Sequence, residues 1–276
     1  MTAYVFDGKK FAKDKEKLLS NKVRQLKSSG ITPTVAAILV GNDTSSKIYI
    51  GLKKKAAERV GVELHLIKFT RTTQGKLVHL IKELNQDRQI HGMMVQLPLP
   101  GQLNNRATRE KILNTIASEK DVDGLRSKAS FLPATVKAIL YSIKEAQKVK
   151  SLPKDMGGVA ACVVGASGMV GKPLAGGLRK MGVEVVKTDV KTKNLKEETL
   201  KADLLISATG VPNLIESDVV RSGAVVIDVG APKGDVDFPE VSKVASFITP
   251  VPGGIGPVTV ISLMENVIEA AEKFDT

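Results

Sequence analysis

Apolar and polar positions follow two different periods along this chain, and stretches of the two kinds alternate. Apolar, β-branched runs predict seven strands, at 34–41, 63–69, 91–97, 159–165, 183–188, 203–207 and 224–229. Helical periodicity near 45–60 and 75–87 separates the first three strands, and Ser46 or Thr44 suits the N-cap of the first helix. This alternation is typical of parallel α/β architecture.

A segment rich in Pro and Gly divides the pattern into two parts. A helix predicted at 134–148 precedes SLPKDMGG, whose composition is typical of a linker. The last segment, roughly 257–273, is a predicted amphipathic helix that could pack back on the first part. We therefore expect two parallel-sheet α/β domains with a cleft between them: residues 1–148, with about 257–276 packing on them, and residues 149–256.

The composition is that of a globular protein. At 276 residues and 42% hydrophobic, the chain can bury a sizeable core. No apolar run approaches the roughly 18 to 20 residues that span a bilayer, and the first residues lack a signal-peptide pattern. The single cysteine, Cys162, lies within a predicted strand, where burial is the expected role. We expect a cytoplasmic, disulfide-free protein with no membrane partner.

The net charge of +12 is unevenly distributed, which indicates an anionic partner for the first half. Residues 1–150 contain 28 Lys and Arg against 13 Asp and Glu, and residues 151–276 contain 13 against 16. Much of the excess lies on the amphipathic segment from Lys9 to Lys27, where a solvated helix face explains it better. With seven Phe, three Tyr and no known motif, we expect no nucleic-acid partner.

A glycine-rich turn follows the predicted strand at 159–165. The segment VAACVVGASGMVGKP places Gly165, Gly168 and Gly171 before a helical pattern, which can present backbone N–H groups to a dinucleotide pyrophosphate. The spacing is G-x-x-G-x-x-G rather than the usual G-x-G-x-x-G, so an ordinary strand-to-helix turn is the alternative. Asp189 ends the next apolar run, where an acidic side chain can accept hydrogen bonds from a ribose. The pattern predicts a Rossmann-like second domain.

Three segments of the chain carry further candidate chemistry. In SKIYIGLKKKAAERVG, Tyr49 and Lys53 share a helix face, and a lysine in an enclosed cleft can exchange protons near neutral pH, although an exposed lysine face explains the pattern too. Gln96, before two prolines, and Asp123, in KDVDG, are expected at sheet-edge loops, Asp123 alternatively as a turn former. The segment 248–260, ITPVPGGIGPVTV, predicts a rigid loop leading into a helix at Pro257.

Two kinds of catalytic site have no support in the pattern. His65, His79 and His91 lack metal-ligand spacing, so we expect no metal. No G-x-S-x-G motif indicates a nucleophilic serine.

Taken in order, several segments resemble the bifunctional methylenetetrahydrofolate dehydrogenase/methenyltetrahydrofolate cyclohydrolase family. They are VGNDTSSKIYIGLKKKAAERVGV, GMMVQLPLP, EKDVDGL, VVGASGMVGKP, GAVVIDVG, GDVDF and ASFITPVPGGIGPVTV. The resemblance implies interconversion of 5,10-methylene-, 5,10-methenyl- and 10-formyltetrahydrofolate, by hydride transfer to NAD(P)+ and by hydrolysis.

The resemblance also implies roles for individual residues. Lys53 would be the catalytic lysine, with Gln96 tuning it, Tyr49 contacting the folate ring system and Asp123 holding the pterin. Substrate contacts would further include Val95, Leu97, Pro252, Gly253, Gly254, Gly256, Pro257 and Thr259. Cofactor contacts would include Gly165, Ala166, Ser167, Gly168, Asp189, Val190, Thr209, Gly210 and Ala231. The family usually forms homodimers, and a basic first half would favour capture of polyglutamylated folate.

The chain departs from the family pattern near both expected sites. The connection from Gly124 to Phe131 is several residues shorter, and P-C-T-P is here Pro133-Ala134-Thr135-Val136, which puts cyclohydrolase efficiency in question. NADP-using members commonly have Arg where this chain has Ala166, and a Ser where Val190 aligns. Without that guanidinium, and with Asp189 repelling a 2′-phosphate, we predict a preference for NAD over NADP.

Other interpretations stay open at this point. Lys187, Lys191 and Lys193 are candidates to pair with a 2′-phosphate. A dehydrogenase with little cyclohydrolase activity, or a folate- or nucleotide-binding protein without catalysis, would also fit the sequence.

Overall fold

A computed structural model describes residues 2–274. The helices and strands, in chain order, are β1 Tyr4–Val5, α1 Gly8–Ser28, β2 Thr34–Val40, α2 Thr44–Val60, β3 Glu63–Phe69, α3 Gln74–Gln86, β4 Gly92–Val95, the 3-10 turn η1 Gly101–Asn104, α4 Arg106–Thr115, α5 Ala134–Lys148, β5 Ala160–Val164, α6 Gly171–Lys180, β6 Glu184–Thr188, α7 Leu195–Thr199, β7 Leu204–Ser207, the 3-10 turn η2 Ser217–Val219, β8 Val225–Asp228, α8 Phe238–Val241, β9 Phe247–Ile248 and α9 Ile255–Phe274. All seven predicted strands are present, so the parallel α/β class is confirmed.

The chain divides into two compact units, each with its own parallel sheet. The three-stranded unit contains 13–134 and the chain from Val260, and the six-stranded unit contains the chain up to Ala12 together with 135–259. The expected domain boundary at 148 differs from this division because α5 belongs almost wholly to the six-stranded unit. Residues 1 and 275–276 of the expected domains lie outside the described residues.

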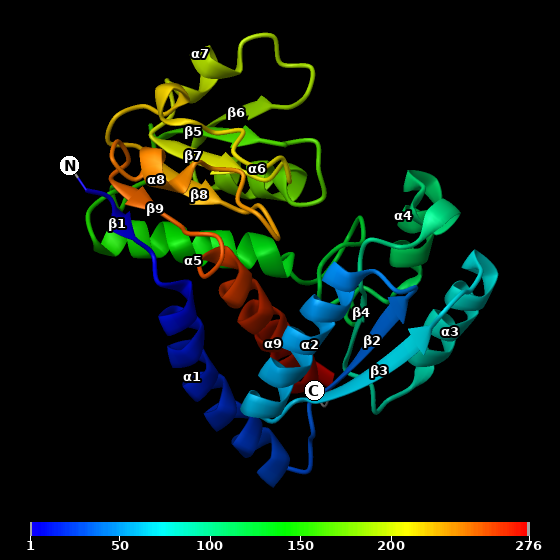
Figure 1. Cartoon of the computed structure of the whole chain (residues 1–276). Coiled ribbons are helices and arrows are strands. Elements are labelled where there is room, and N and C mark those ends of the chain that lie inside the picture. Colours follow the sequence, from blue (N-terminus) through cyan, green and yellow to red (C-terminus); the bar gives the residue numbers. More distant parts are fainter. Residues whose placement is uncertain (1, 275–276) are drawn as a thin grey trace. The chain divides into compact units, whose positions relative to one another are not determined.

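The three-stranded sheet has the order β3-β2-β4, with β2 at its centre (Figure 1). Thr34 of β2 is in register with Glu63 of β3, and Val35 with Gly92 of β4. Every residue of β2 and β4 is buried, which explains why both appear in the sequence as continuous apolar runs. Within this unit Lys15 of α1 forms an ion pair with Glu265 of α9, at 2.7 Å.

The six-stranded sheet has the order β1-β9-β8-β7-β5-β6 (Figure 1). Alternate residues of its strands belong to two separate apolar cores. Val163 and Ile206 pack with residues of α5 and α6, whereas Cys162 and Leu205 pack with residues of α7 and α8. Helices therefore cover both faces, which is the expectation for a parallel sheet.

In both sheets the chain reverses its direction of strand addition at one strand. From β5 the chain adds β6 on one side and then β7 on the other, and from β2 it adds β3 and then β4 in the same way. Ligands of open α/β sheets bind outside the carboxyl ends of the strands at such switch points. Gly165 directly follows β5 and Gln96 directly follows β4, so two predicted site residues stand at these positions.

Several local details differ from the sequence predictions. The N-cap of α2 is Asp43, whose side chain accepts from the Ser46 backbone N–H at 2.7 Å, and is neither Thr44 nor Ser46. The last helix begins at Ile255, so Pro257 lies inside its first turn, where a missing N–H costs no hydrogen bond. Strands β1 and β9 have two residues each, too short for a periodicity to reveal.

Candidate active site

Helix α2 carries a buried lysine in its packed stripe. Lys53 is 7% exposed and lies in register with the buried Ile50 and Ala57. Its ammonium nitrogen donates to the side-chain oxygen of Gln96 at 3.0 Å and to the sulfur of Met94 at 3.5 Å. Lys54 and Lys55 are exposed, as the helical spacing predicts. An exposed helix face therefore explains Lys54 and Lys55, but it does not explain the buried Lys53.

The surroundings of Lys53 favour its neutral amine. Burial lowers the pKa of Lys53 below the usual 10.5, because a charged ammonium is poorly solvated there. The negative charge of Asp123 acts in the opposite direction and raises that pKa. A lysine under these two influences can take up and release a proton at pH values below those of an exposed lysine.

Tyr49 lies one helical turn before Lys53 on α2. It is half-buried, and burial raises the pKa of its phenol above the usual 10.0. The hydroxyl therefore stays protonated at neutral pH and can donate a hydrogen bond. This matches the predicted shared face of the two side chains, since residues four apart on a helix lie on one side.

Gln96 is held where β4 ends. Its backbone N–H donates to the Ile38 carbonyl of β2 at 2.8 Å, which extends the sheet pairing by one residue. Its side-chain amide nitrogen donates to the Leu97 carbonyl at 2.7 Å, and this fixes the amide so that the oxygen faces Lys53. Val95 is buried in β4, and the Leu97–Pro98 peptide bond that follows is cis.

Asp123 is positioned by a tight turn that its neighbour Asp121 organises. Asp121 is fully buried, and its carboxylate accepts from the backbone N–H of Gly124 at 3.1 Å and of Arg126 at 2.8 Å. Burial raises the pKa of Asp121 to about 6, against the effect of these hydrogen bonds, and Asp123 raises it further. Sequence reasoning selected Asp123 and missed Asp121.

The altered segment Pro133-Ala134-Thr135-Val136 closes over this turn. Gly124 has a φ of +70°, and a Cβ there would come within 2.6 Å of the Pro133 nitrogen. The Ala134 N–H donates to the Asp123 carbonyl at 3.4 Å. Asn266 of α9 donates to the carbonyls of Val122 and Leu132 at 2.8 and 3.1 Å, which ties both sides of the shortened connection together. Despite the substitutions, the turn that carries Asp123 is supported from both ends.

The glycine-rich turn after β5 is closed by steric fit. Gly165 has a φ of +83°, and a Cβ on it would lie 2.5 Å from the Ala208 carbonyl oxygen. A Cβ on Gly171, at the start of α6, would overlap the Gly165 carbonyl. Glycine is needed at both positions, which supports a close-packed strand-turn-helix of the dinucleotide-binding type. Ser167 and Gly168 at the tip are exposed and can approach a ligand, whereas Ala166 is buried.

Asp189 lies beside this turn. Thr188 is the last residue of β6, and its carbonyl accepts from the N–H groups of Gly165 and Ala166 at 2.9 and 3.1 Å. The next residue in the chain, Asp189, therefore adjoins the glycine turn. One carboxylate oxygen of Asp189 accepts from the Lys191 N–H at 2.9 Å. Val190 is fully exposed, so it presents its side chain to solvent.

A carboxylate that sequence reasoning missed organises the turn after β7. One oxygen of the buried Asp235 accepts from Ser207, from the N–H and hydroxyl of Thr209 and, at 3.3 Å, from the Gly210 N–H. The predicted cofactor residues Thr209 and Gly210 are thus fixed by a side chain that lies 25 or more residues later. Asp235 lies in the segment GDVDF, which was among the segments that resemble the family. No sequence periodicity indicates which backbone or side-chain donors its carboxylate would accept from.

The Pro- and Gly-rich segment before α9 folds as a compact loop in the six-stranded unit. The Val251–Pro252 peptide bond is cis and Gly253 has a φ of +113°. The Gly254 N–H donates to the Pro250 carbonyl at 2.8 Å, and a Cβ on Gly254 would lie 2.6 Å from that oxygen. Gly256 has open space around it. Only residues 249–254 form the loop, because Ile248 belongs to β9 and residues from Ile255 belong to α9, so it is shorter than the segment predicted for 248–260. Ala231 precedes a second cis proline in the same unit.

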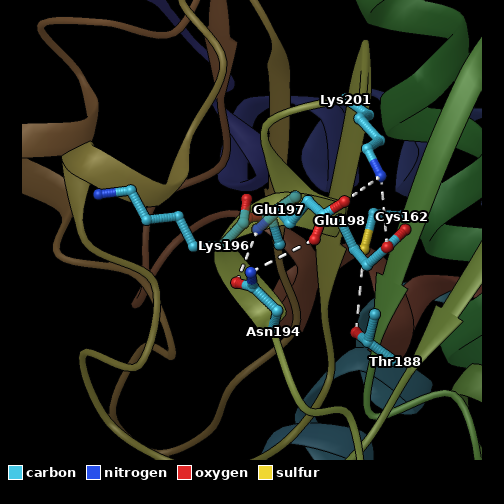
Figure 2. A network of polar contacts seen from close by, with 8 residues as sticks. Cys162, Thr188, Asn194, Lys196, Glu197, Glu198 and Lys201 are labelled. Atoms are coloured by element: carbon cyan, nitrogen blue, oxygen red, sulfur yellow. Dashed lines mark hydrogen bonds and ion pairs between the residues drawn. The ribbon is translucent and has the colours of Figure 1, made fainter.

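The lone cysteine is a packing residue. Cys162 is fully buried, and burial raises the pKa of its thiol to about 11. Figure 2 shows its sulfur beside the Thr188 hydroxyl, 3.8 Å away, and the nearby polar network in which Lys201 bridges Glu197 and Glu198. The expected burial of Cys162 is confirmed.

Residues 2–274 contain no group of three or more His, Cys, Asp and Glu side chains that could hold a metal ion. No helix among the same residues is long and apolar enough to cross a membrane.

Two family models together match nearly the whole chain. The catalytic domain of tetrahydrofolate dehydrogenase/cyclohydrolase matches residues 6–123, and the NAD(P)-binding domain of the same family matches residues 133–275. The chain belongs to this family. The resemblance drawn from the sequence motifs is thereby confirmed.

Individual relatives agree with the family assignment over their full length. The bifunctional protein FolD of Bacillus subtilis is 39% identical over 290 residues, covering 99% of each chain. The crystal structure of the FolD enzyme of Campylobacter jejuni is 38% identical with a TM-score of 0.90, covering 98% of this chain and 99% of that one. The Trypanosoma brucei FolD, solved with NADP and an inhibitor, is 29% identical with a TM-score of 0.89, covering 99% and 98%.

Proposed function

We propose that this family member is bifunctional: it oxidises 5,10-methylenetetrahydrofolate with a nicotinamide dinucleotide and hydrolyses the methenyl product to 10-formyltetrahydrofolate. The observation that carries the proposal is the buried Lys53, which donates to Gln96 at 3.0 Å and is influenced by the charge of Asp123. Within a family whose relatives are named bifunctional FolD proteins, this set places a proton-transfer group among polar partners.

Hydrolysis needs a group that moves protons at the reacting carbon. Water adds to the methenyl carbon with loss of a proton, and the carbon–nitrogen bond that breaks later requires protonation of the leaving nitrogen. We assign both transfers to the Lys53 amine, whose lowered pKa makes its neutral form accessible. Gln96 orients the amine, Tyr49 offers a hydroxyl donor from the preceding turn, and Asp123 serves to hold the polar edge of the pterin.

The residues after β5 and β7 fit a dinucleotide. The glycines let the turn pack closely against the start of α6, and the exposed tip at Ser167 and Gly168 lies before this helix, where a pyrophosphate can be bound. We assign the cofactor contacts to these residues and to Thr209, Gly210 and Ala231. A dinucleotide held by these residues would supply the hydride acceptor for oxidation of the methylene carbon.

Initial rates with methylenetetrahydrofolate and dinucleotide, and separate decay of methenyltetrahydrofolate, test the two activities. We expect both, with reduced cofactor and methenyl product separated by absorbance. Hydrolysis no faster than in buffer would leave a dehydrogenase only, and absence of both reactions despite folate binding would leave a binding protein.

We propose that NAD is the preferred cofactor. Ala166 has no group to pair with a 2′-phosphate, and Asp189 places a carboxylate beside the glycine turn, where a free 2′-hydroxyl can donate to it. Lys187, Lys191 and Lys193 are exposed near this carboxylate and favour the phosphate instead. Turnover with NADP+ equal to or better than with NAD+ would contradict the preference.

We propose polyglutamylated folate as the physiological substrate form. The excess positive charge of residues 1–150 supports it, although Lys15 and Lys22 of α1 already form ion pairs with Glu265 and Glu272. The KM for a polyglutamylated folate should rise steeply with salt, and that for the monoglutamate should not. Equal salt dependence would remove this assignment.

We further propose a homodimer through the six-stranded unit. Strand β6 is an edge strand, and Val186 on it and Val190 just after it are exposed apolar residues. Sedimentation should give twice the monomer mass, and replacing Val186 with Lys should lower it toward the monomer.

A further inference from the structure

Asp235 lies at the centre of a hydrogen-bond set that joins three sheet-edge segments of the six-stranded unit. Four donors converge on one of its oxygens: the Ser207 hydroxyl at 2.8 Å, the Thr209 N–H at 2.7 Å, the Thr209 hydroxyl at 2.8 Å and the Gly210 N–H at 3.3 Å. The Thr209 hydroxyl in turn accepts from the Val211 N–H at 3.1 Å. One carboxylate oxygen therefore accepts from three residues at the end of β7 and in the turn after it, in addition to the backbone bond from the Ala208 N–H to the Val164 carbonyl at 3.0 Å.

Asp235 is itself held by the carboxylate that ends β8. Asp228 accepts from the N–H groups of Gly230 and Asp235 with one oxygen, at 2.8 and 3.0 Å, and from the Val236 N–H with the other, at 3.0 Å. Burial raises the pKa of Asp228 to about 6 despite these donors. The two aspartates form a chain in which Asp228 places Asp235, and Asp235 places the turn after β7.

The second oxygen of Asp235 is buried and has no hydrogen-bond partner. A Cβ on Gly230 would overlap it, so the backbone of the turn after β8 packs directly against this atom. Desolvating a carboxylate oxygen without a partner is unfavourable, and such exceptions occur where a group is required for a specific arrangement. The desolvation cost of this oxygen is therefore not offset by a hydrogen bond of its own, whereas the other oxygen accepts four.

We propose that Asp235 is a positioning residue for dinucleotide binding: it sets the backbone of Thr209 and Gly210 at the carboxyl edge of the sheet, and contacts no substrate itself. The inference rests on the proposed dehydrogenase function, because it concerns how tightly that cofactor binds. Thr209 and Gly210 follow β7, the strand next to the β5 switch point. Loss of the carboxylate leaves four donors without their acceptor and loosens this segment.

Asp235→Asn and Asp235→Ala, with Asp237→Asn as the matched control, test the proposal. Asn keeps one acceptor oxygen and loses its charge, whereas Ala loses the acceptor altogether. Asp237 lies two residues on and caps α8 by accepting from the Glu240 N–H, away from the turn after β7. Calorimetric titration with NAD+ alone and with NADP+ alone reports binding, and hydrolysis of methenyltetrahydrofolate reports the chemistry assigned to Lys53.

We expect the Kd for the better dinucleotide to rise about tenfold in Asp235→Asn and about a hundredfold in Asp235→Ala. The dehydrogenase KM for the dinucleotide should rise in step, with kcat at saturation within about threefold of the wild type. Hydrolysis per folded molecule and cofactor binding by Asp237→Asn should stay unchanged. A merely structural role would instead lower hydrolysis and binding together.

Equal Kd values for wild type and both Asp235 variants would overturn the inference. If Asp235→Ala does not fold, a double-mutant cycle of Thr209→Val and Asp235→Asn decides. The increase in the dinucleotide Kd of the double variant should be much smaller than the product of the increases in the two single variants. An increase equal to that product would count against the proposal. Failure of the proposed function looks different, because the wild type itself would then show no nicotinamide-dependent turnover.

Discussion

The Lys53 region and the glycine turn after β5 use opposite means to prepare a site. Around Lys53, chemistry resides in side chains: a buried amine, an amide oxygen 3.0 Å away and the charge of Asp123. At Gly165 the important feature is the absence of side chains, since a Cβ would lie 2.5 Å from the Ala208 carbonyl. One region is tuned by charge and burial, and the other by steric fit.

This difference predicts how each region tolerates change. A side-chain site loses chemistry while keeping its shape, because neighbouring groups can repack around a substituted side chain. A close-packed backbone turn loses shape first, since a carbonyl oxygen cannot move without its peptide unit. Four substitutions or conditions separate the two behaviours.

The largest effect is expected for Lys53→Met. The substitution removes the amine to which both proton transfers are assigned. Methenyl hydrolysis should therefore fall by about a thousandfold, within the usual range for loss of a general acid-base group. Lys54→Met is the matched control, because Lys54 is exposed and its nearest carboxylate, Glu58, is 4.0 Å away. Hydrolysis that survives Lys53→Met would end the assignment of this residue.

Gly165→Ala should have the next largest effect, and on the other activity. The positive φ and the close carbonyl force the turn to shift, so we expect a dinucleotide KM raised by about tenfold or more and unfolding at lower temperature, with hydrolysis per folded molecule retained. Gly176→Ala on α6 is the control, since nothing lies within 4 Å of its Cβ position and helix propensity favours alanine. Equal losses in both variants would show that steric fit at Gly165 is not decisive.

Gln96→Glu should change the pH profile of hydrolysis more than its maximum. A carboxylate 3.0 Å from the amine favours the ammonium form, so the pKa of Lys53 rises and the acidic limb of the rate, where the amine is protonated, moves to higher pH. Gln102→Glu, on the exposed turn η1, adds the same charge away from Lys53 and should leave the profile in place. An unshifted profile in Gln96→Glu would mean that another group controls hydrolysis.

The smallest effect concerns stability and pH. The folded pKa of Lys53 is below its unfolded value near 10.5, so in the window between them the folded state binds fewer protons, and wild-type stability rises with pH. Lys53→Met lacks this contribution. In urea unfolding, the stability difference between wild type and variant should change in favour of the wild type by up to about 1.4 kcal/mol per pH unit inside that window. A difference that stays constant as the pH is raised toward 10.5 would argue against a buried, titrating amine.

Prediction from sequence succeeded where one residue type meets one local requirement. The glycine-rich turn after β5 and the helix face shared by Tyr49 and Lys53 follow from turn chemistry and from a 3.6-residue period, and both were predicted, whereas the burial of Lys53 stayed open beside an exposed lysine face. The N-cap of α2 was assigned to the wrong residue because Asp43, Thr44 and Ser46 are all good caps and only the backbone course decides among them. Asp121 was missed because its neighbour Asp123 carries the same chemistry two positions later.

The sequence by itself determined the alternation of strands and helices, the glycine turn and the family, because periodicity, turn residues and motif order are local properties. Only the tertiary structure decided that Gln96 faces Lys53, that Asp121 supports the turn of Asp123 and that Asp235 places Thr209 and Gly210. Lys53 and Gln96, and likewise Thr209 and Asp235, lie far apart in the chain. Asp121 lies near Gly124 in the chain, but the sequence does not say that its carboxylate accepts from that N–H. Hydrogen bonds depend on distance and direction in space, and neither quantity is written in the spacing of residues.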